Sequence, residues 1–156
     1  LSFEQNTIQD YVATAGIDVL IALHACDTAT DDALAKGIQH HADLIVVAPC
    51  CHKQIRRSIE EGKKETSLDF MLQHGIFLER QSEMLTDSMR ALILEYFGYQ
   101  VKVFAFVDEA NTPKNVMITA QKHKINPEKQ AKIKLQLDQI KADFGIKYHH
   151  LERLMF

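Results

Sequence analysis

DVLIALHACD, residues 18–27, is the stretch that decides the predicted fold of this chain. Five apolar residues follow an aspartate and stop at His24, Cys26 and Asp27, whose side chains can bind or react. A short, uninterrupted apolar run is typical of a strand buried on both faces, which is the usual state of strands in parallel sheets. Open α/β sheets bind ligands at the carboxyl ends of such strands. The residues after Leu23 therefore mark a candidate site.

The same pattern occurs again in residues 43–48, which are followed by Pro49-Cys50-Cys51-His52. Between the two runs, Thr28 is a predicted helix cap with carboxylates behind it, and Gly37 is the predicted helix end. A strand, a helix and a second strand in this order form a right-handed crossover between parallel neighbours. The two strand ends would then share one rim, which carries His24, Cys26, Asp27, Cys50, Cys51 and His52.

The centre of the chain predicts a helix and a hairpin. Lys53 to Ser67 is strongly charged, which favours a solvated helix or, alternatively, a lid over the rim. Thr86 is the predicted cap of a helix that ends at Gly98. Strands are expected over Val101 to Val107 and Val116 to Ala120, and the connection between them is too short for a crossover helix. We therefore expect an antiparallel pair.

The N-terminal end of the chain predicts the end of a strand, and the C-terminal end predicts a helix. Leu1 to Glu4 is predicted to be the end of a strand. Asn126-Pro127-Glu128 combines a cap, a first-turn proline and an acid, so it predicts a helix start. An apolar stripe at helical spacing follows and stops at Gly145. The lysines around that stripe indicate a solvated face or, alternatively, an RNA-holding arm.

The composition fits one soluble domain, because 156 residues with 46% hydrophobic content can bury a single core. A net charge of −3 does not favour nucleic-acid binding, although a local basic face remains compatible with it. Three cysteines cannot form a disulfide framework, and this usage indicates a reducing compartment. Neither a membrane span nor a signal peptide is recognisable, so we expect a cytoplasmic protein that does not bind membranes.

Four motifs carry a resemblance to a known family. LHACDTATD (residues 23–31) and APCCHK (48–53) are similar to two signatures of a bacterial branch of the class I S-adenosylmethionine-dependent methyltransferases, and LTDSMR (85–90) and TPKN (112–115) are similar to two further patterns of that branch. The chain resembles, more distantly, the eukaryotic transfer-RNA 2′-O-methyltransferases. The resemblance extends from Ser2 to Gln121.

The resemblance implies an α/β fold that corresponds to the C-terminal half of a Rossmann-like methyltransferase sheet. The implied strand order is 4-5-7-6, with the last strand antiparallel. Residues 1–121 would form this partial methyltransferase domain, and residues 122–156 a helical C-terminal extension packed on the same domain. The family's glycine-rich loop and its ribose-binding acid have no counterpart in these residues. We therefore expect the chain alone to bind cofactor weakly and to be inactive.

A sheet that begins at strand four would leave one edge of that strand without a neighbour. Unpaired edges invite pairing with another chain, so we expect a homodimer formed through this edge.

The resemblance also assigns roles to residues. The cofactor S-adenosylmethionine would contact Thr7, Ile8, His24, Ala25 and Cys26. The catalytic candidates are His24, Asp27, Cys51 and His52. The acceptor would meet Pro49, Cys50, Lys53, Arg56, Lys114 and Asn115. His24 and Asp27 are the candidate bases, because imidazole titrates near neutral pH, but a His24 ring satisfied by a backbone carbonyl is an equal alternative.

The cysteine pair Cys50-Cys51 allows three interpretations. Buried cysteines behave as small hydrophobic residues, a cysteine can act as a nucleophile, and the rim cysteines and histidines could supply a zinc set. We rank metal last and predict no metal site, because adjacent cysteines rarely both bind one ion.

The predicted function is therefore the C-terminal portion of an S-adenosylmethionine-dependent methyltransferase that acts on RNA. Two alternatives belong to other classes: a non-catalytic binding module that retains the rim, and a zinc-stabilised interaction domain.

Overall fold

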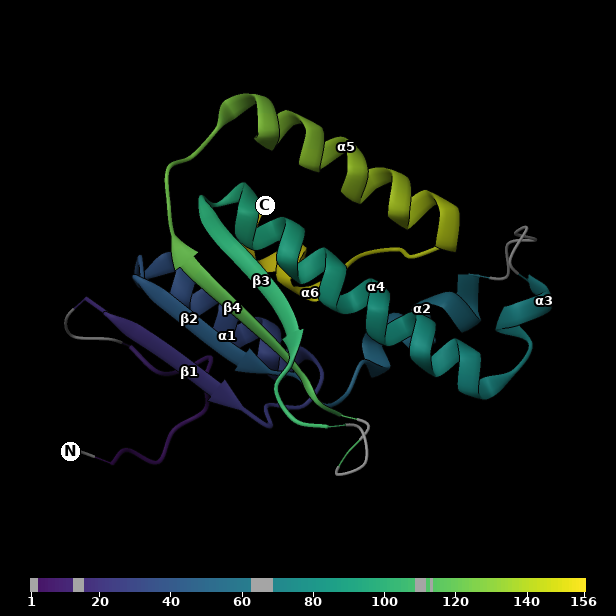
Figure 1. The fold of residues 1–156 in the computed structure, drawn as a ribbon, viewed down its shortest axis with the longest axis horizontal. Coiled ribbons are helices and arrows are strands. Elements are labelled where there is room, and N and C mark those ends of the chain that lie inside the picture. Colours follow the sequence, from purple (N-terminus) through teal and green to yellow (C-terminus); the bar gives the residue numbers. More distant parts are fainter. Residues whose placement is uncertain (1–2, 13–15, 63–68, 109–111, 113) are drawn as a thin grey trace.

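The computed structural model describes residues 3–12, 16–62, 69–108, 112 and 114–156. Its strands form a four-stranded sheet in the order β1-β2-β4-β3 (Figure 1). The strands are β1 (Val19–Leu23), β2 (Leu44–Ala48), β3 (Tyr99–Ala105) and β4 (Val116–Lys122). β1 and β2 are parallel, and β4 is antiparallel to both β2 and β3. The predicted parallel neighbours and the predicted antiparallel pair are both confirmed.

The helices make the fold a mixed α/β structure, as predicted. They are α1 (Thr28–Gln39), α2 (Lys53–Gly62), α3 (Asp69–Leu72), α4 (Gly75–Tyr96), α5 (Pro127–Phe144) and α6 (His150–Met155). α1 packs on β1 and β2, α4 packs on β3 and β4, α5 packs on α4, and α6 packs on α1. Of the charged stretch that begins at Lys53, the described part is the helix α2, while residues 63–67 lie outside the described residues. No helix within the described part of the chain is long and apolar enough to cross a membrane.

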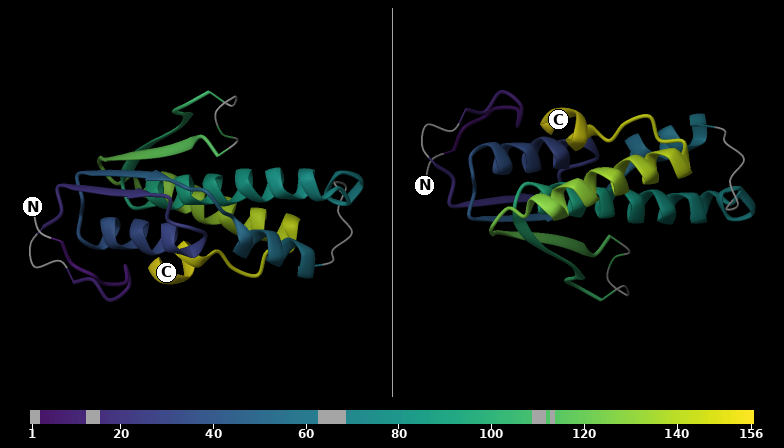
Figure 2. Two further views of the ribbon diagram at one scale, coloured as in Figure 1. Left: turned by 90° about the horizontal axis from the view of Figure 1, so that it is seen from below. Right: turned by 90° about the horizontal axis from the view of Figure 1, so that it is seen from above.

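The helices cover one face of the sheet. Ile45 and Val47 are buried on this face, together with Ile118 and Ala120 of the paired strand β4. Figure 2 shows α1 and α6 on the same side of the sheet, and the end of β3 and the start of β4 leaning away from the helices.

The opposite face is open at β1. Val19, Ile21 and Leu23 alternate along this strand and are 50%, 63% and 55% exposed. The prediction that β1 is buried on both faces is therefore wrong. Its second face has no covering layer among the residues that the structure describes.

The first helix differs from its prediction at both ends. Its N-cap is Asp27 rather than Thr28, and no side chain caps it. The helix continues through Gly37 to Gln39. Gly37 serves packing instead of termination, because a Cβ at this position would lie 2.7 Å from the Ile45 side chain.

The helix predicted to start at Thr86 begins much earlier, at Gly75. The Thr86 hydroxyl donates to the Ser82 carbonyl at 2.6 Å, one turn back in the same helix. A threonine that bonds in this way is compatible with a helix interior, which explains the error. The predicted glycine after the end is present: Gly98 follows the cap residue Phe97 with φ +85°.

At the N-terminus, Phe3 and Glu4 are not in a strand, and Phe3 is 91% exposed. The strand predicted there is wrong for these two residues, and residues 1–2 lie outside the described part.

The C-terminal helix signals are confirmed. The Asn126 side chain accepts a hydrogen bond from the Lys129 amide at 3.1 Å, and Gly145 ends α5 in the left-handed conformation. Ile133 and Leu137 of α5 are buried in the core.

Candidate functional site

The site lies where β1 and β2 end. Because the strands are parallel, with Leu23 opposite Ala48, the loop after β1 (residues 24–27) lies beside the loop after β2 (residues 49–52). These two loops, which we call the rim, carry all six residues that the sequence placed there. The thiols of the rim form an open upper layer, and a buried lower layer, which includes residues of α1 and α4, lies beneath them.

The open layer contains the three thiols of the chain. Cys26 Sγ lies 3.2 Å from Cys50 Sγ and 3.5 Å from Cys51 Sγ, and the Cys50 and Cys51 sulfurs are 3.7 Å apart. Cys26 is exposed, and the other two cysteines are half-buried. All three are free thiols. We refer to them as the thiol cluster.

The thiols differ in acidity. Hydrogen bonds from Cys50 and Cys51, with the nearby Lys53 cation, lower the pKa of Cys26 from its usual 9.0. Burial and the neighbouring sulfurs raise the pKa of Cys50 to about 12. The cluster therefore loses its first proton most readily at Cys26, where the other two S–H groups can donate to the thiolate.

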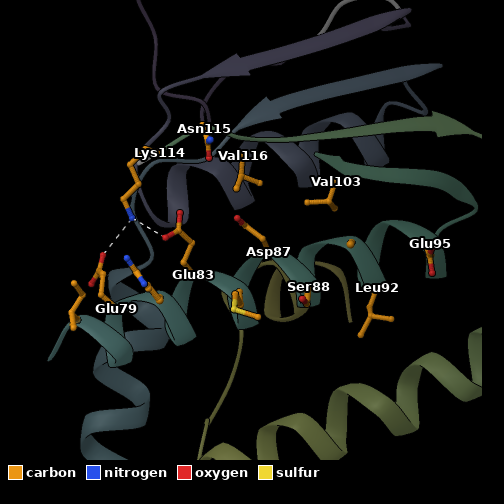
Figure 3. Close-up of a pocket in the computed structure, with 14 residues that line it drawn as sticks. Glu79, Glu83, Asp87, Ser88, Leu92, Glu95, Val103, Lys114, Asn115 and Val116 are labelled. Carbon is orange, nitrogen blue, oxygen red and sulfur yellow. Dashed lines mark hydrogen bonds and ion pairs between the residues drawn. The ribbon is translucent and has the colours of Figure 1, made fainter. Parts of the chain in front are cut away.

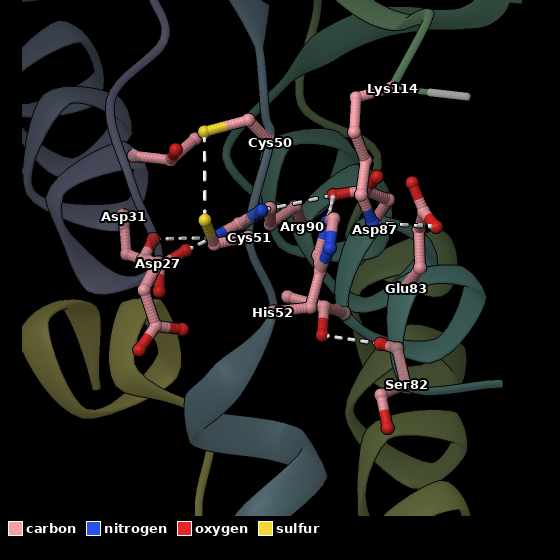
Figure 4. Close-up of polar contacts among 12 residues, drawn as sticks. Asp27, Asp31, Cys50, Cys51, His52, Ser82, Glu83, Asp87, Arg90 and Lys114 are labelled. Carbon is pink, nitrogen blue, oxygen red and sulfur yellow. Dashed lines mark hydrogen bonds and ion pairs between the residues drawn. The ribbon is translucent and has the colours of Figure 1, made fainter. Parts of the chain in front are cut away.

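Beneath the thiols lies a buried ionic network centred on Arg90 (Figure 4). The Arg90 guanidinium donates to Asp31 at 2.7 Å, to Asp87 at 3.0 Å and to the Asp27 carbonyl at 2.8 Å. Its side chain is fully buried. Burial acts to lower the pKa of Arg90, but the carboxylates of Asp31 and Asp87 outweigh burial and raise it. The hydrogen bonds of the Arg90 cation thus connect α1, α4 and the loop after β1.

His52 belongs to this buried layer. It is 2% exposed, and its Nε2 lies 3.2 Å from Asp87 Oδ1. Its Nδ1 and the Asp87 Oδ2 have no partner among the described residues. In this position His52 can orient the loop after β2, whereas direct contact with a substrate would require it to become exposed.

Asp27 joins the two layers. One of its carboxylate oxygens accepts a hydrogen bond from the backbone N–H of Gln54 at 3.0 Å, in the first turn of α2. Asp27 and His24 both have positive φ, +55° and +58°. Left-handed backbone at residues other than glycine is uncommon and often occurs at functional sites. Two such residues in one four-residue loop mark the loop after β1 as specialised.

The other loop residues have simpler positions. His24 is exposed, and Ala25 is half-buried with its carbonyl accepting from the Thr30 hydroxyl at 2.6 Å. Pro49 is buried. Of the two candidate bases, His24 is therefore the one open to solvent.

Most cations expected to meet the acceptor are already paired. Arg56 lies 2.7 Å from Glu79, and Lys114 lies 3.1 Å from Glu83. Lys53 is exposed beside Cys26 and makes no ion pair with another described residue. Among the three cations that were expected to contact the acceptor, Lys53 is therefore the one available to bind a phosphate.

A groove of about 1060 Å³ separates α4 from the β3–β4 hairpin (Figure 3). We call it the α4–hairpin groove. Apolar side chains such as Met84, Leu92 and Val103 line it, and Asp87, Lys114 and Asn115 add polar groups. The side-chain amide of Asn115 donates a hydrogen bond to the Val107 carbonyl at 2.9 Å, which fixes the start of β4. Because Asp87 also bonds Arg90, it connects the groove to the buried network.

Thr7 and Ile8, which are expected to contact the cofactor, lie beside β1. They line a cavity of about 370 Å³ against β1 and α1. The lining of this cavity includes neither His24 nor Cys26. The structure therefore brings together the rim residues, while Thr7 and Ile8 lie in a separate cavity beside β1.

Sequence reasoning gave no role to Asp31, Asp87 and Arg90, although all three fall within the quoted motifs. The signal that could have found them is charge placed among apolar residues: Asp87 and Arg90 alternate with Leu85 and Met89 on a helix that must bury one face.

Comparison with known proteins supports a methyltransferase family for this chain. A family model described as a methyltransferase domain matches residues 1–58, which include β1, α1, β2 and the first six residues of α2. Two curated proteins, from Homo sapiens and Macaca fascicularis, are each 31% identical to the chain over 126 residues. Both are named glutathione S-transferase C-terminal domain-containing protein. The match covers 67% of this chain and 20% of each relative, so the chain spans about a fifth of their length. No solved structure matches significantly.

Proposed function

We propose that this chain forms part of an S-adenosylmethionine-dependent methyltransferase. The observation that carries the proposal is the methyltransferase-domain match over residues 1–58, because it covers both loops of the rim. The observed order β1-β2-β4-β3, with β4 antiparallel, supports equating these strands with strands 4-5-7-6 of the class I sheet. In this proposal the chain is the C-terminal portion of the catalytic domain.

The residues present fit the cofactor in part. The specialised loop after β1 and the cavity at Thr7 and Ile8 provide two surfaces, and the glycine-rich loop and the ribose-binding acid would have to come from other residues. When bound, S-adenosylmethionine supplies an electrophilic methyl group on a sulfonium. This chain would contribute orientation of the acceptor and removal of its proton, and alone it would bind cofactor weakly and remain inactive.

His24 is the proposed base, because its imidazole is exposed at the rim and histidine is the most frequent general base in enzymes. The acceptor proton would pass to His24 Nδ1 or Nε2. Asp27 and His52 would position the two loops, and Cys51 would act as a wall of the site or as an alternative nucleophile.

We propose RNA as the acceptor. The support is the resemblance to the transfer-RNA 2′-O-methyltransferases and the exposed cations Lys53 and Arg57 at the start of α2. The α4–hairpin groove is the proposed place for the acceptor base, because its apolar walls suit a base.

We also propose that the isolated chain forms a homodimer through β1. Among the described residues this strand pairs with β2 alone, and its exposed face is apolar. Ile21→Lys would place a charge on this face and should shift the chain toward monomer in light scattering. A wild-type chain that is monomeric at high concentration would refute the dimer.

A cytoplasmic location is part of the same proposal, because three free thiols within 3.7 Å of one another persist most easily in a reducing compartment.

The test is transfer of labelled methyl groups by the natural-length protein that carries this chain. RNA should become labelled, and His24→Ala should reduce the rate by about 10²-fold or more, the usual contribution of a general base. His123→Ala is the matched control. His123 is also exposed, but it follows the last residue of β4, at the end of the sheet away from the rim.

Other outcomes separate the alternatives. Label in protein or in small molecules would replace RNA as the acceptor and retain the enzyme class. Absence of both cofactor binding and methyl transfer would favour the non-catalytic binding module, which retains the rim but not the cofactor.

A further inference from the structure

We propose that Cys26, Cys50 and Cys51 form a three-thiolate binding site for one zinc ion, with a fourth coordination position open to solvent. The proposal depends on the geometry of the thiol cluster and is independent of methyl transfer. It revises the sequence-based ranking that placed metal last.

The distances are those of a nearly formed ligand set. Two thiolates around one tetrahedral zinc, each with a Zn–S bond of about 2.3 Å, are separated by about 3.8 Å. The three Sγ–Sγ distances here are 3.2, 3.5 and 3.7 Å. A movement of a few tenths of an ångström, within reach of side-chain rotation, would accommodate the ion. The sequence stretches involved are 24 residues apart, so only the pairing of β1 with β2 brings them together.

The objection to adjacent cysteines does not apply to this loop. Neighbouring residues in a strand point to opposite faces, and their sulfurs could not meet. Cys50 and Cys51 follow the end of β2 and precede α2, where the chain turns. The turn directs both sulfurs to the same side, 3.7 Å apart.

Zinc binding requires deprotonated thiols, and the Lys53 cation lies near Cys26. Bound zinc then supplies the positive charge that keeps all three sulfurs deprotonated, so binding should release protons and strengthen as pH rises.

The fourth position is open because no histidine completes the set. The group of ligand atoms that lie within 4.8 Å of one another contains the three cysteines alone among the described residues. The His52 ring is held by Asp87 beneath the rim. Cys26 is exposed, which gives the ion an entry path and leaves room for a water molecule. Three protein ligands with an open position are typical of zinc sites that bind or activate a further ligand.

A disulfide is the competing use of this cluster. It would join two sulfurs at about 2.0 Å and leave the third cysteine free. The near-equal spacing of all three pairs favours a shared ion over a single bond.

The experiment is titration of the reduced, metal-free chain with Cd²⁺ as a spectroscopic probe, followed by competition with Zn²⁺. The chain contains three cysteines in all, so every cadmium–thiolate absorption band reports on this cluster. We expect saturation at one ion per chain and displacement by Zn²⁺. Zinc should also protect all three cysteines of the unmodified protein from alkylation, which mass spectrometry counts without any variant.

Cys26→Ser, Cys50→Ser and Cys51→Ser should each weaken Cd²⁺ binding at least tenfold and reduce the band by about one third, because each removes one of three thiolate ligands. His123→Ala, at an exposed histidine far from the rim, should leave binding unchanged. The proposal is overturned by absence of the band, by protection of fewer than three cysteines, or by a Cys26→Ser variant that binds as tightly as the wild type.

Discussion

The thiol cluster and the buried ionic network beneath it meet at the same two loops but differ in exposure and in bonding. Below, Arg90, Asp31 and Asp87 are buried and joined by charged hydrogen bonds of 2.7 and 3.0 Å. Above, Cys26 and His24 are exposed, and their thiol and imidazole groups are open to solvent. This difference indicates two roles: the buried network holds the two loops in position, and the exposed side chains bind or react. Changes below should therefore affect folding, and changes above should affect binding and reactivity.

The largest effect is expected at Arg90. Arg90→Met removes the cation that compensates two buried carboxylates, which should lower the free energy of unfolding by about 3–5 kcal/mol. Urea denaturation monitored by circular dichroism measures the change. The control is Arg80→Met, on the same helix at an exposed position, and its effect should be small. Equal effects of the two substitutions would contradict a structural role for the buried layer.

The next effect concerns His149, which lies against the buried layer. It is fully buried with neither ring nitrogen bonded to a described residue, and burial lowers its pKa from 6.5 to about 4. Asp31 and Glu152 act to raise this pKa, and Arg90 and His150 act to lower it further.

Because the folded-state pKa is below the unfolded value, the unfolded chain takes up a proton first as pH falls. Stability from neutral His149 is complete above pH 6.5 and decreases as pH falls toward 4, by about 3 kcal/mol in total. Unfolding measured across this range should show the loss, and His149→Leu should remove it. His123→Leu, at an exposed site, should retain the full pH dependence.

The third prediction concerns the rates at which the three cysteines of the thiol cluster are alkylated. At neutral pH without metal, Cys26 should be alkylated first and Cys50 last, because the pKa of Cys26 is lowered and that of Cys50 is raised to about 12. Timed iodoacetamide labelling with peptide mass spectrometry gives the order. Lys53→Ala should slow the labelling of Cys26, since it removes the neighbouring cation. Equal rates at all three cysteines would remove the distinction between them.

The smallest effect is expected from the backbone of the loop after β1. His24 has φ +58°, so His24→Gly should relieve strain and leave stability unchanged or raise it by up to about 1 kcal/mol. His40 has φ −92° at the end of α1 and provides the control. His40→Gly should reduce stability, because glycine gains freedom in the unfolded chain without relieving any strain. Thermal unfolding of the two variants distinguishes strain in this loop from a general effect of glycine.

Local patterns in the sequence were sufficient for several elements. The apolar runs before His24 and Pro49 predicted parallel neighbours with adjacent ends, and Asn126-Pro127 predicted the start of α5. Each of these signals acts within a few residues, through strand burial or helix capping, so it can be read without the rest of the fold. The same local reading failed at Thr86, where a hydroxyl that could cap a helix instead bonds within it.

The functional arrangement required the tertiary structure. The apolar neighbours of Arg90 could mark it as a candidate for burial, but nothing local identifies its partner Asp31, which is 59 residues away. The sequence by itself determined which groups follow β1 and β2, because covalent order places them there. Only the fold decided that three sulfurs meet above while an arginine is enclosed below, because those distances depend on strand register and on how α1 and α4 pack against the sheet.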